Sequence, residues 1–225
     1  MLHLNFLNIN YISLMCYNKE TSITTYIIGS IASLYLIVKK DNQYKIIGAF
    51  FLYVIQMQMI EYLLWVHRVK CDAYNINIST IGSILNHFQP IVLFLLIKYL
   101  NPKIYEKNKK FIDMLLGVYI VNLLLYSLNL YPMECTTLDN SNHLYWKWNH
   151  KKNTLLFYII FVLVLVLLNY LGFAYPYNIF FAIIFLGSFL ISKYIYGNTK
   201  AVGAIWCWYA ALAPVFILMF NLIKN

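Results

Sequence analysis

Seven apolar runs divide the chain, and each is about as long as a helix must be to cross a lipid bilayer. The runs fall at 22–38, 45–66, 77–100, 111–131, 154–172, 177–196 and 201–222. Charged residues make up only 11% of the 225 residues, against about 25% in ordinary soluble domains, and the runs leave no room for a soluble domain. The sequence therefore predicts an all-α integral membrane protein, a bundle of about seven transmembrane helices.

The first run is the weakest of the seven, because serine and threonine dilute its apolarity. Residues 22–225 are expected to form a single seven-helix transmembrane domain, and residues 1–21 an N-terminal extension without the features of a signal peptide. Met15 is an alternative start, which would place the first residues upstream of the true beginning. The connection 132–153 is long and polar, so it predicts a structured loop at the membrane surface, with Trp146 and Trp148 in the interface.

The orientation of the chain is only weakly encoded, because basic residues are divided almost equally between the two sides of the bilayer. Two features favour an N-terminus outside. Asn77 opens an N-glycosylation sequon, and Cys71 and Cys135 fall on the same outer side, where disulfides persist. We favour Cys71 with Cys135 among the three pairings that four cysteines allow, since both lie in loops; free thiols are the alternative in a reducing cytoplasm.

Polar side chains inside apolar runs mark the candidate site, because they are costly in hydrocarbon and usually face the interior of a bundle. They are Gln58, Glu61, Asn86, His87, Gln89, Lys193 and Trp206. With the N-terminus outside, most of them converge in the outer half of the bundle. One hypothesis is an outward-opening pocket for a cation, a proton or a small polar ligand; the alternative is hydrogen bonding between helices.

Glu61 is the only acidic side chain well inside a run, since Asp113 lies at the mouth of the fourth. A buried carboxyl group requires a proton, a partner such as Lys193, or a bound cation. We therefore expect the Glu61 carboxyl to face the bundle, within hydrogen-bonding reach of the third or the seventh helix.

Catalytic motifs give little support to an enzyme. His87 has no second histidine within a run, so the sequence predicts no metal site, and it contains no cofactor-binding motif. The net charge of +9 is spread between the runs and does not form one patch, which argues against nucleic acid as a partner. The expected partners are the lipid bilayer and a small ion or polar ligand.

Four short motifs lie in order along the chain: Met15-Cys16-Tyr17, Gln58-Met59-Ile60-Glu61 with Trp65, Gln89-Pro90, and Trp206-Cys207-Trp208. Together they resemble a family of uncharacterised multi-pass membrane proteins of giant DNA viruses, with distant relatives in bacteria. The resemblance implies a start at Met15 and draws attention to Glu61, Gln89, Trp206 and Cys207 without implying an activity.

Two functions follow as hypotheses. The first is a carrier, channel or sensor with a small polar site in the outer half of the bundle. The second is a structural or scaffolding protein of a viral or host-cell membrane.

Overall fold

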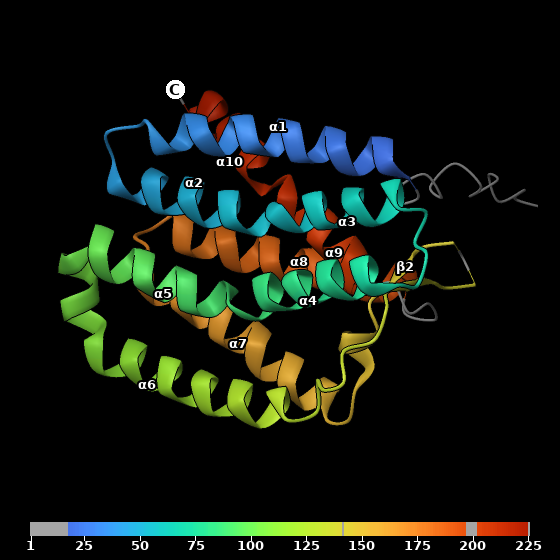
Figure 1. Cartoon of the computed structure of the whole chain (residues 1–225). Helices are drawn as coiled ribbons and strands as arrows, with labels where there is room; N and C mark the ends of the chain where they lie inside the picture. The colour runs from blue at the N-terminus through green and yellow to red at the C-terminus, as the bar shows by residue number, and fades with distance from the viewer. Residues whose placement is uncertain (1–17, 141, 197–201, 225) are drawn as a thin grey trace, which may run out of the picture.

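The computed structural model describes residues 18–140, 142–196 and 202–224, and in this part of the chain it is built of helices (Figure 1). The helices are α1 (Lys19–Ile37), α2 (Asn42–Val54), α3 (Gln56–Val66), α4 (Ala73–His87), α5 (Gln89–Leu100), α6 (Pro102–Ser127), α7 (Thr154–Gly172), α8 (Tyr177–Tyr196), α9 (Val202–Ala211) and α10 (Ala213–Lys224). A two-stranded hairpin, β1 (Thr137–Leu138) with β2 (Leu144–Tyr145), and the 3-10 helix η2 (Lys147–His150) lie between α6 and α7. The all-α prediction is confirmed.

The helices run between two ends of the molecule (Figure 1). We call residues 128–153 the lid, and the end that carries it the lid end. The beginning of α1 and the α3–α4 connection also lie at the lid end, whereas the α1–α2 and α5–α6 connections and the C-terminus lie at the opposite end. The prediction of a structured loop at 132–153 is confirmed by the hairpin and η2.

Among the residues that the structure describes, five helical segments are long and apolar enough to cross a membrane, fewer than the seven predicted. They are Asn42–Val66, Pro102–Ser127, Thr154–Gly172, Tyr177–Tyr194 and Val202–Phe220. Helices α4 and α5, which meet at an angle of 45°, would together make a sixth. Helix α1 forms but is not among them, because its serines and threonines lower its hydropathy.

The third predicted run is broken at Phe88, between α4 and α5. Pro90 is the second residue of α5 and has no N–H to donate to the preceding turn. At the bend the Tyr119 hydroxyl donates a hydrogen bond of 2.5 Å to the carbonyl oxygen of His87. This bond from α6 satisfies a carbonyl group of the last turn of α4, which regular helix geometry no longer serves.

Helix α1 has its apolar side chains outside and its small or polar ones inside. The buried positions are Ser22, Thr25, Gly29, Ala32, Ser33 and Leu36. The exposed apolar positions are Ile27, Ile28, Ile31, Leu34 and Tyr35. The small residues allow close helix packing: a Cβ on Gly48 of α2 would come within 2.5 Å of the Ser33 carbonyl oxygen.

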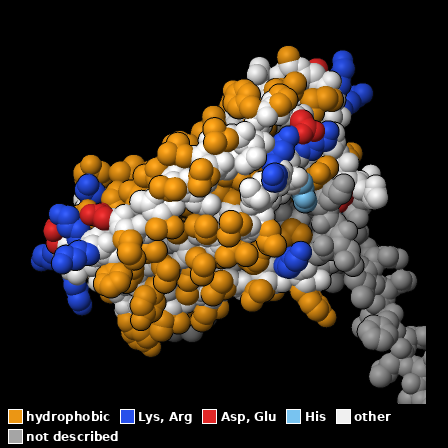
Figure 2. Space-filling model, turned by 90° about the horizontal axis from the view of Figure 1, so that it is seen from below, with side chains coloured by type: hydrophobic (Ala, Val, Ile, Leu, Met, Phe, Trp, Pro, Cys, Tyr) orange, Lys and Arg blue, Asp and Glu red, His pale blue; other side chains and the backbone are white. Residues whose placement is uncertain are grey.

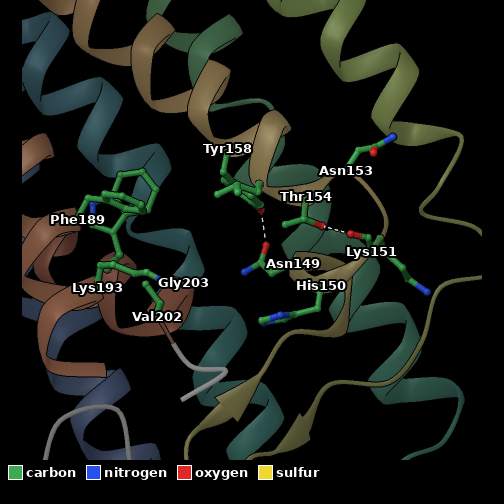
Figure 3. Close-up of a pocket in the computed structure, with 12 residues that line it drawn as sticks. Asn149, His150, Lys151, Asn153, Thr154, Tyr158, Phe189, Lys193, Val202 and Gly203 are labelled. Carbon is green, nitrogen blue, oxygen red and sulfur yellow. Dashed lines mark hydrogen bonds between the residues drawn. The ribbon is translucent and has the colours of Figure 1, made fainter. Parts of the chain in front are cut away.

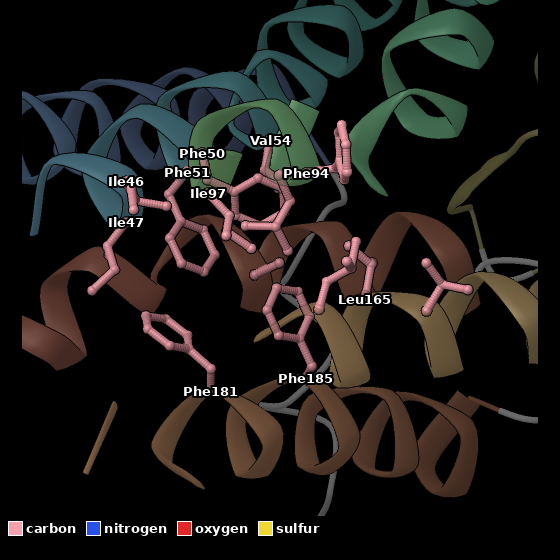
Figure 4. Packing of buried hydrophobic residues seen from close by; sticks show 14 of the residues in the cluster. Ile46, Ile47, Phe50, Phe51, Val54, Phe94, Ile97, Leu165, Phe181 and Phe185 are labelled. Atoms are coloured by element: carbon pink, nitrogen blue, oxygen red, sulfur yellow. The ribbon is translucent and has the colours of Figure 1, made fainter. Parts of the chain in front are cut away.

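The core on the opposite side of α2 is aromatic (Figure 4). Phe51 stacks on Phe181 and Phe185 of α8, with ring centres 5.9 and 6.0 Å apart. Outside the core, apolar side chains cover the middle of the face in Figure 2, and lysine and arginine gather toward its two ends. That distribution is typical of a protein that spans a hydrocarbon layer.

Candidate functional site

The lid is attached to the start of α4 by three kinds of bond. A disulfide joins Cys71 to Cys135, with the Cα atoms 5.5 Å apart, which is the pairing that the sequence analysis favoured. Beside it, the Asn75 amide donates to the Thr136 carbonyl oxygen and accepts from the Thr136 N–H, both at 2.9 Å. The Ser79 and Thr136 hydroxyl groups add a bond of 2.7 Å. The lid is therefore fixed to the bundle at buried, fully paired polar groups.

The two lid tryptophans are buried, so the expectation that they lie in the membrane interface is wrong. Trp146 and Trp148 stack on each other with ring centres 4.9 Å apart. The Trp148 ring meets the His87 imidazole edge-on at 5.3 Å, and its carbonyl oxygen accepts a hydrogen bond from the Tyr126 hydroxyl. The Trp148 ring therefore covers His87, the last residue of α4.

His87 lies at the centre of a buried polar cluster. Its Nδ1 is 3.1 Å from the Ser83 hydroxyl, and its Nε2 is 3.4 Å from the Tyr158 hydroxyl. The Tyr158 hydroxyl also accepts from the Asn86 amide at 3.1 Å and donates to the Asn149 side-chain oxygen. Tyr158 thus connects α4 and the lid to α7.

A pocket of about 580 Å³ opens on the other side of Tyr158 (Figure 3). One wall is formed by η2 and the start of α7, and the other by α8 and the start of α9. The lining residues are Asn149, His150, Lys151, Asn153, Thr154, Leu155, Tyr158, Phe189, Lys193, Val202, Gly203 and Trp206. Its size is within the range of natural small-molecule sites.

Two of the predicted site residues, Lys193 and Trp206, line this pocket. The Trp206 indole N–H donates to the Ser188 hydroxyl at 3.0 Å, and its ring packs edge-on against Phe189 at 5.5 Å. The indole is therefore held in place by α8. Asn86 and His87 lie one hydrogen bond behind the pocket, through Tyr158.

Gln58 and Glu61 form a separate pair on α3. Both are fully buried, so the Glu61 carboxyl faces the bundle as expected. Its hydrogen bond in the described chain comes from the Gln58 amide, at 3.1 Å, and not from the third or the seventh predicted helix. Lys193 is exposed and lines the pocket, and no ion pair joins it to Glu61 in the described residues, so it does not serve as the counter-charge.

Two other predicted positions lie outside the pocket. Gln89 is buried at the start of α5. Asn77 is exposed on α4, whereas the hydroxyl of the sequon's Ser79 is buried against Thr136. Within the described ranges no three histidine, cysteine or acidic side chains are grouped as a metal site would require. The residues of the Met15-Cys16-Tyr17 motif lie outside the described residues.

Ion pairs at the lid end are confined to its surface. Glu134 of the lid bonds the Lys151 ammonium and lies 3.4 Å from that of Lys147, and these contacts lower the pKa of its carboxyl group. Asp72, which caps α4, accepts from His67 at 2.8 Å, and this bond lowers the pKa of the Asp72 carboxyl. Lys151 is therefore largely neutralised at the edge of the pocket.

Sequence reasoning missed Tyr158, Asn149 and Trp148, which complete the cluster around His87. Tyr158 lies in an apolar run where tyrosine gives no special signal, and its role depends on which helix α7 meets. Trp148 and Asn149 could have been found from the connection 132–153, because it holds more polar and aromatic residues than a simple turn needs. The chain matches no known protein-family model, no curated protein and no solved structure.

Proposed function

We propose that the chain is an integral membrane protein of seven crossings that binds a small ligand in the pocket between α7, α8, α9 and the lid. Five segments meet the length and hydropathy of a crossing. The bent pair α4 and α5 supplies a sixth, and α1, with its apolar face outward, the seventh. The resemblance to viral membrane proteins favours a viral or host-cell membrane as the location.

The lid end is the outer side in this proposal. The disulfide Cys71–Cys135 lies there, and disulfides persist in oxidising compartments. The exposed Asn77 of the sequon lies on the first turns of α4, close to the same end. The N-terminus of α1 is at this end too, so the proposal has the N-terminus outside.

The observation that carries the binding function is the pocket itself. Its walls come from segments far apart in sequence, and most of its polar lining residues lie on the wall formed by η2 and the start of α7. Behind Tyr158 the bundle is filled by the His87 imidazole and the rings of Phe157 and Trp148. The centres of these two rings lie 5.1 and 5.3 Å from the centre of the imidazole. A closed floor of this kind favours a receptor or sensor over a channel.

A scaffolding role is the second candidate, and one observation favours it. Asn86, a candidate ligand-binding group, donates its amide to Tyr158 of another helix, as a purely structural residue would. The binding function requires a ligand in the pocket, whereas the scaffolding role does not.

The test is native mass spectrometry of the full chain, purified in detergent and exposed to a polar lipid extract. We expect the wild type to retain one bound molecule and Val202→Trp, which fills the pocket, to lose it. Leu163→Trp, on the exposed face of α7, is the matched control and should retain it. Equal retention by Val202→Trp, with helical content unchanged, would leave the scaffolding role as the better explanation.

A further inference from the structure

We infer that the pocket receives the anionic headgroup of a membrane lipid; this inference rests on the proposed binding function. The sequence had suggested a cation or a proton. The described lining residues include two lysines and a histidine but no acid, so the sign of the site is reversed.

Lys193 supplies the charge that is available to a ligand. The other lining lysine, Lys151, is already paired with Glu134. Lys193 lies near the end of α8, on the wall opposite η2, and the described residues offer its ammonium group no ion-pair partner (Figure 3). Because the described lining residues include no acid, the Lys193 ammonium group can attract an anion without first giving up a carboxylate partner.

Two helices, α7 and α9, begin at the pocket, and their N-termini add to the positive electrostatic potential of Lys193. Thr154 and Leu155 belong to the first turn of α7, and Val202 and Gly203 to the first turn of α9. No side chain caps the N-terminus of α7, although its first N–H group, that of Thr154, donates to the Lys151 carbonyl oxygen at 3.2 Å. Helix N-termini present N–H donors and the positive end of the helix dipole, which favour phosphate and carboxylate groups.

The surroundings of the pocket indicate a lipid as the source of the anion. Leu155 lines the pocket and is 77% exposed, and Leu156 and Ile159 continue the apolar outer surface along α7. Phe189 and Val202 line the opposite wall. The pocket therefore opens onto the surface that would face acyl chains, and an amphiphile could place its head near Lys193 while its chains stay outside.

The experiment uses the full chain in detergent with equimolar phosphatidylglycerol and phosphatidylcholine of identical acyl chains, read by native mass spectrometry. We expect preferential retention of phosphatidylglycerol, and a loss of about fivefold in Lys193→Gln, in keeping with one basic side chain at a membrane surface. Lys193→Arg should restore retention. Lys152→Gln, an exposed lid lysine that does not line the pocket, is the matched control.

The remaining arms separate the ways in which the inference can fail. Equal retention of both lipids by the wild type, lost together in Val202→Trp, would overturn the anion preference and leave the pocket intact. Retention that is unchanged in Val202→Trp would count against the proposed binding function itself. Glycerol 3-phosphate is added as a competitor without acyl chains. We expect it to leave phosphatidylglycerol bound; full displacement would identify a soluble anion as the ligand and refute the lipid assignment.

Discussion

At the scale of single residues, Glu61 is defined by its burial and by one bond. Its carboxyl group is fully buried and accepts from the Gln58 amide on the same helix. Glu61→Gln keeps an acceptor oxygen for that amide, so we expect the melting temperature in detergent to change little. Glu61→Ala leaves the buried amide without its acceptor and should cost about 1–3 kcal/mol of stability.

Thermal unfolding followed by circular dichroism compares the two variants. An equal, large loss in both would show that the negative charge, and not the hydrogen bond, is what the bundle requires. That result would support a bound cation as the partner of the Glu61 carboxylate.

The residue scale is also where the sequence was least informative about the site. Burial of Gln58, Glu61, Asn86, His87 and Gln89 could be predicted, because polar groups avoid lipid. Their grouping could not, because it depends on how the helices are rotated and tilted. A single chain gives the period of an apolar run but not the neighbour that its polar face meets.

At the scale of elements, α1 and α2 are held together by small residues. A methyl group on Gly48 would come within 2.5 Å of the Ser33 carbonyl oxygen and 2.9 Å of the Ile37 amide nitrogen, so the helices would have to separate. Gly48→Ala should therefore lower the melting temperature. Gly117→Ala on α6 is the matched control, because nothing lies within 4 Å of its added methyl group, and alanine favours a helix. Equal melting temperatures for the two variants would contradict this close packing.

The lid has a pH-dependent contact within itself, between Glu134 and the lid residues Lys147 and Lys151. The pKa of Glu134 is lowered in the folded chain, mainly by the hydrogen bond from Lys151, so its contribution is present above the unfolded pKa and is lost as the pH falls through the folded value. We expect Glu134→Gln to lower the free energy of unfolding slightly at pH 7, by less than about 1 kcal/mol because the Glu134 side chain is 46% exposed, and to match the wild type near pH 3.

The control for this pH series is Glu20→Gln, which removes an exposed pair with Lys19 at the start of α1, outside the lid. A difference between Glu134→Gln and the wild type that persists unchanged into acid would show that the lysine contacts of Glu134 do not account for its effect.

Element boundaries were predictable where the chain carries local signals. The run 154–172 coincides with α7, and Pro102 begins α6 directly after α5. The breaks at Ile55 and Leu212 were not predicted, because continuous apolarity hides an irregular turn within a run. The disulfide from the lid to the entry of α4 was predicted, whereas the hydrogen bonds between Asn75 and Thr136, 61 residues apart, were not.

At the scale of the whole molecule, the number of crossings depends on α1, whose exposed face is apolar although its overall hydropathy is low. If α1 crosses, its two ends lie on opposite sides of the bilayer. We expect a membrane-impermeant maleimide to label Lys19→Cys on intact cells, in a Cys16→Ser background, and to label Lys40→Cys only after permeabilisation. Cys207 is buried and should stay unlabelled in both.

Positions on either side of α6 calibrate the assay, because α6 is long and apolar enough to cross. Asn140→Cys in the lid should react on intact cells, and Lys107→Cys at the opposite end should not. The reverse pattern would place the lid inside and contradict the orientation that the disulfide suggests. If neither end of α1 reacts until the cells are permeabilised while the α6 pair behaves as expected, α1 lies along the inner membrane surface, the bundle has six crossings, and both termini face the inner compartment.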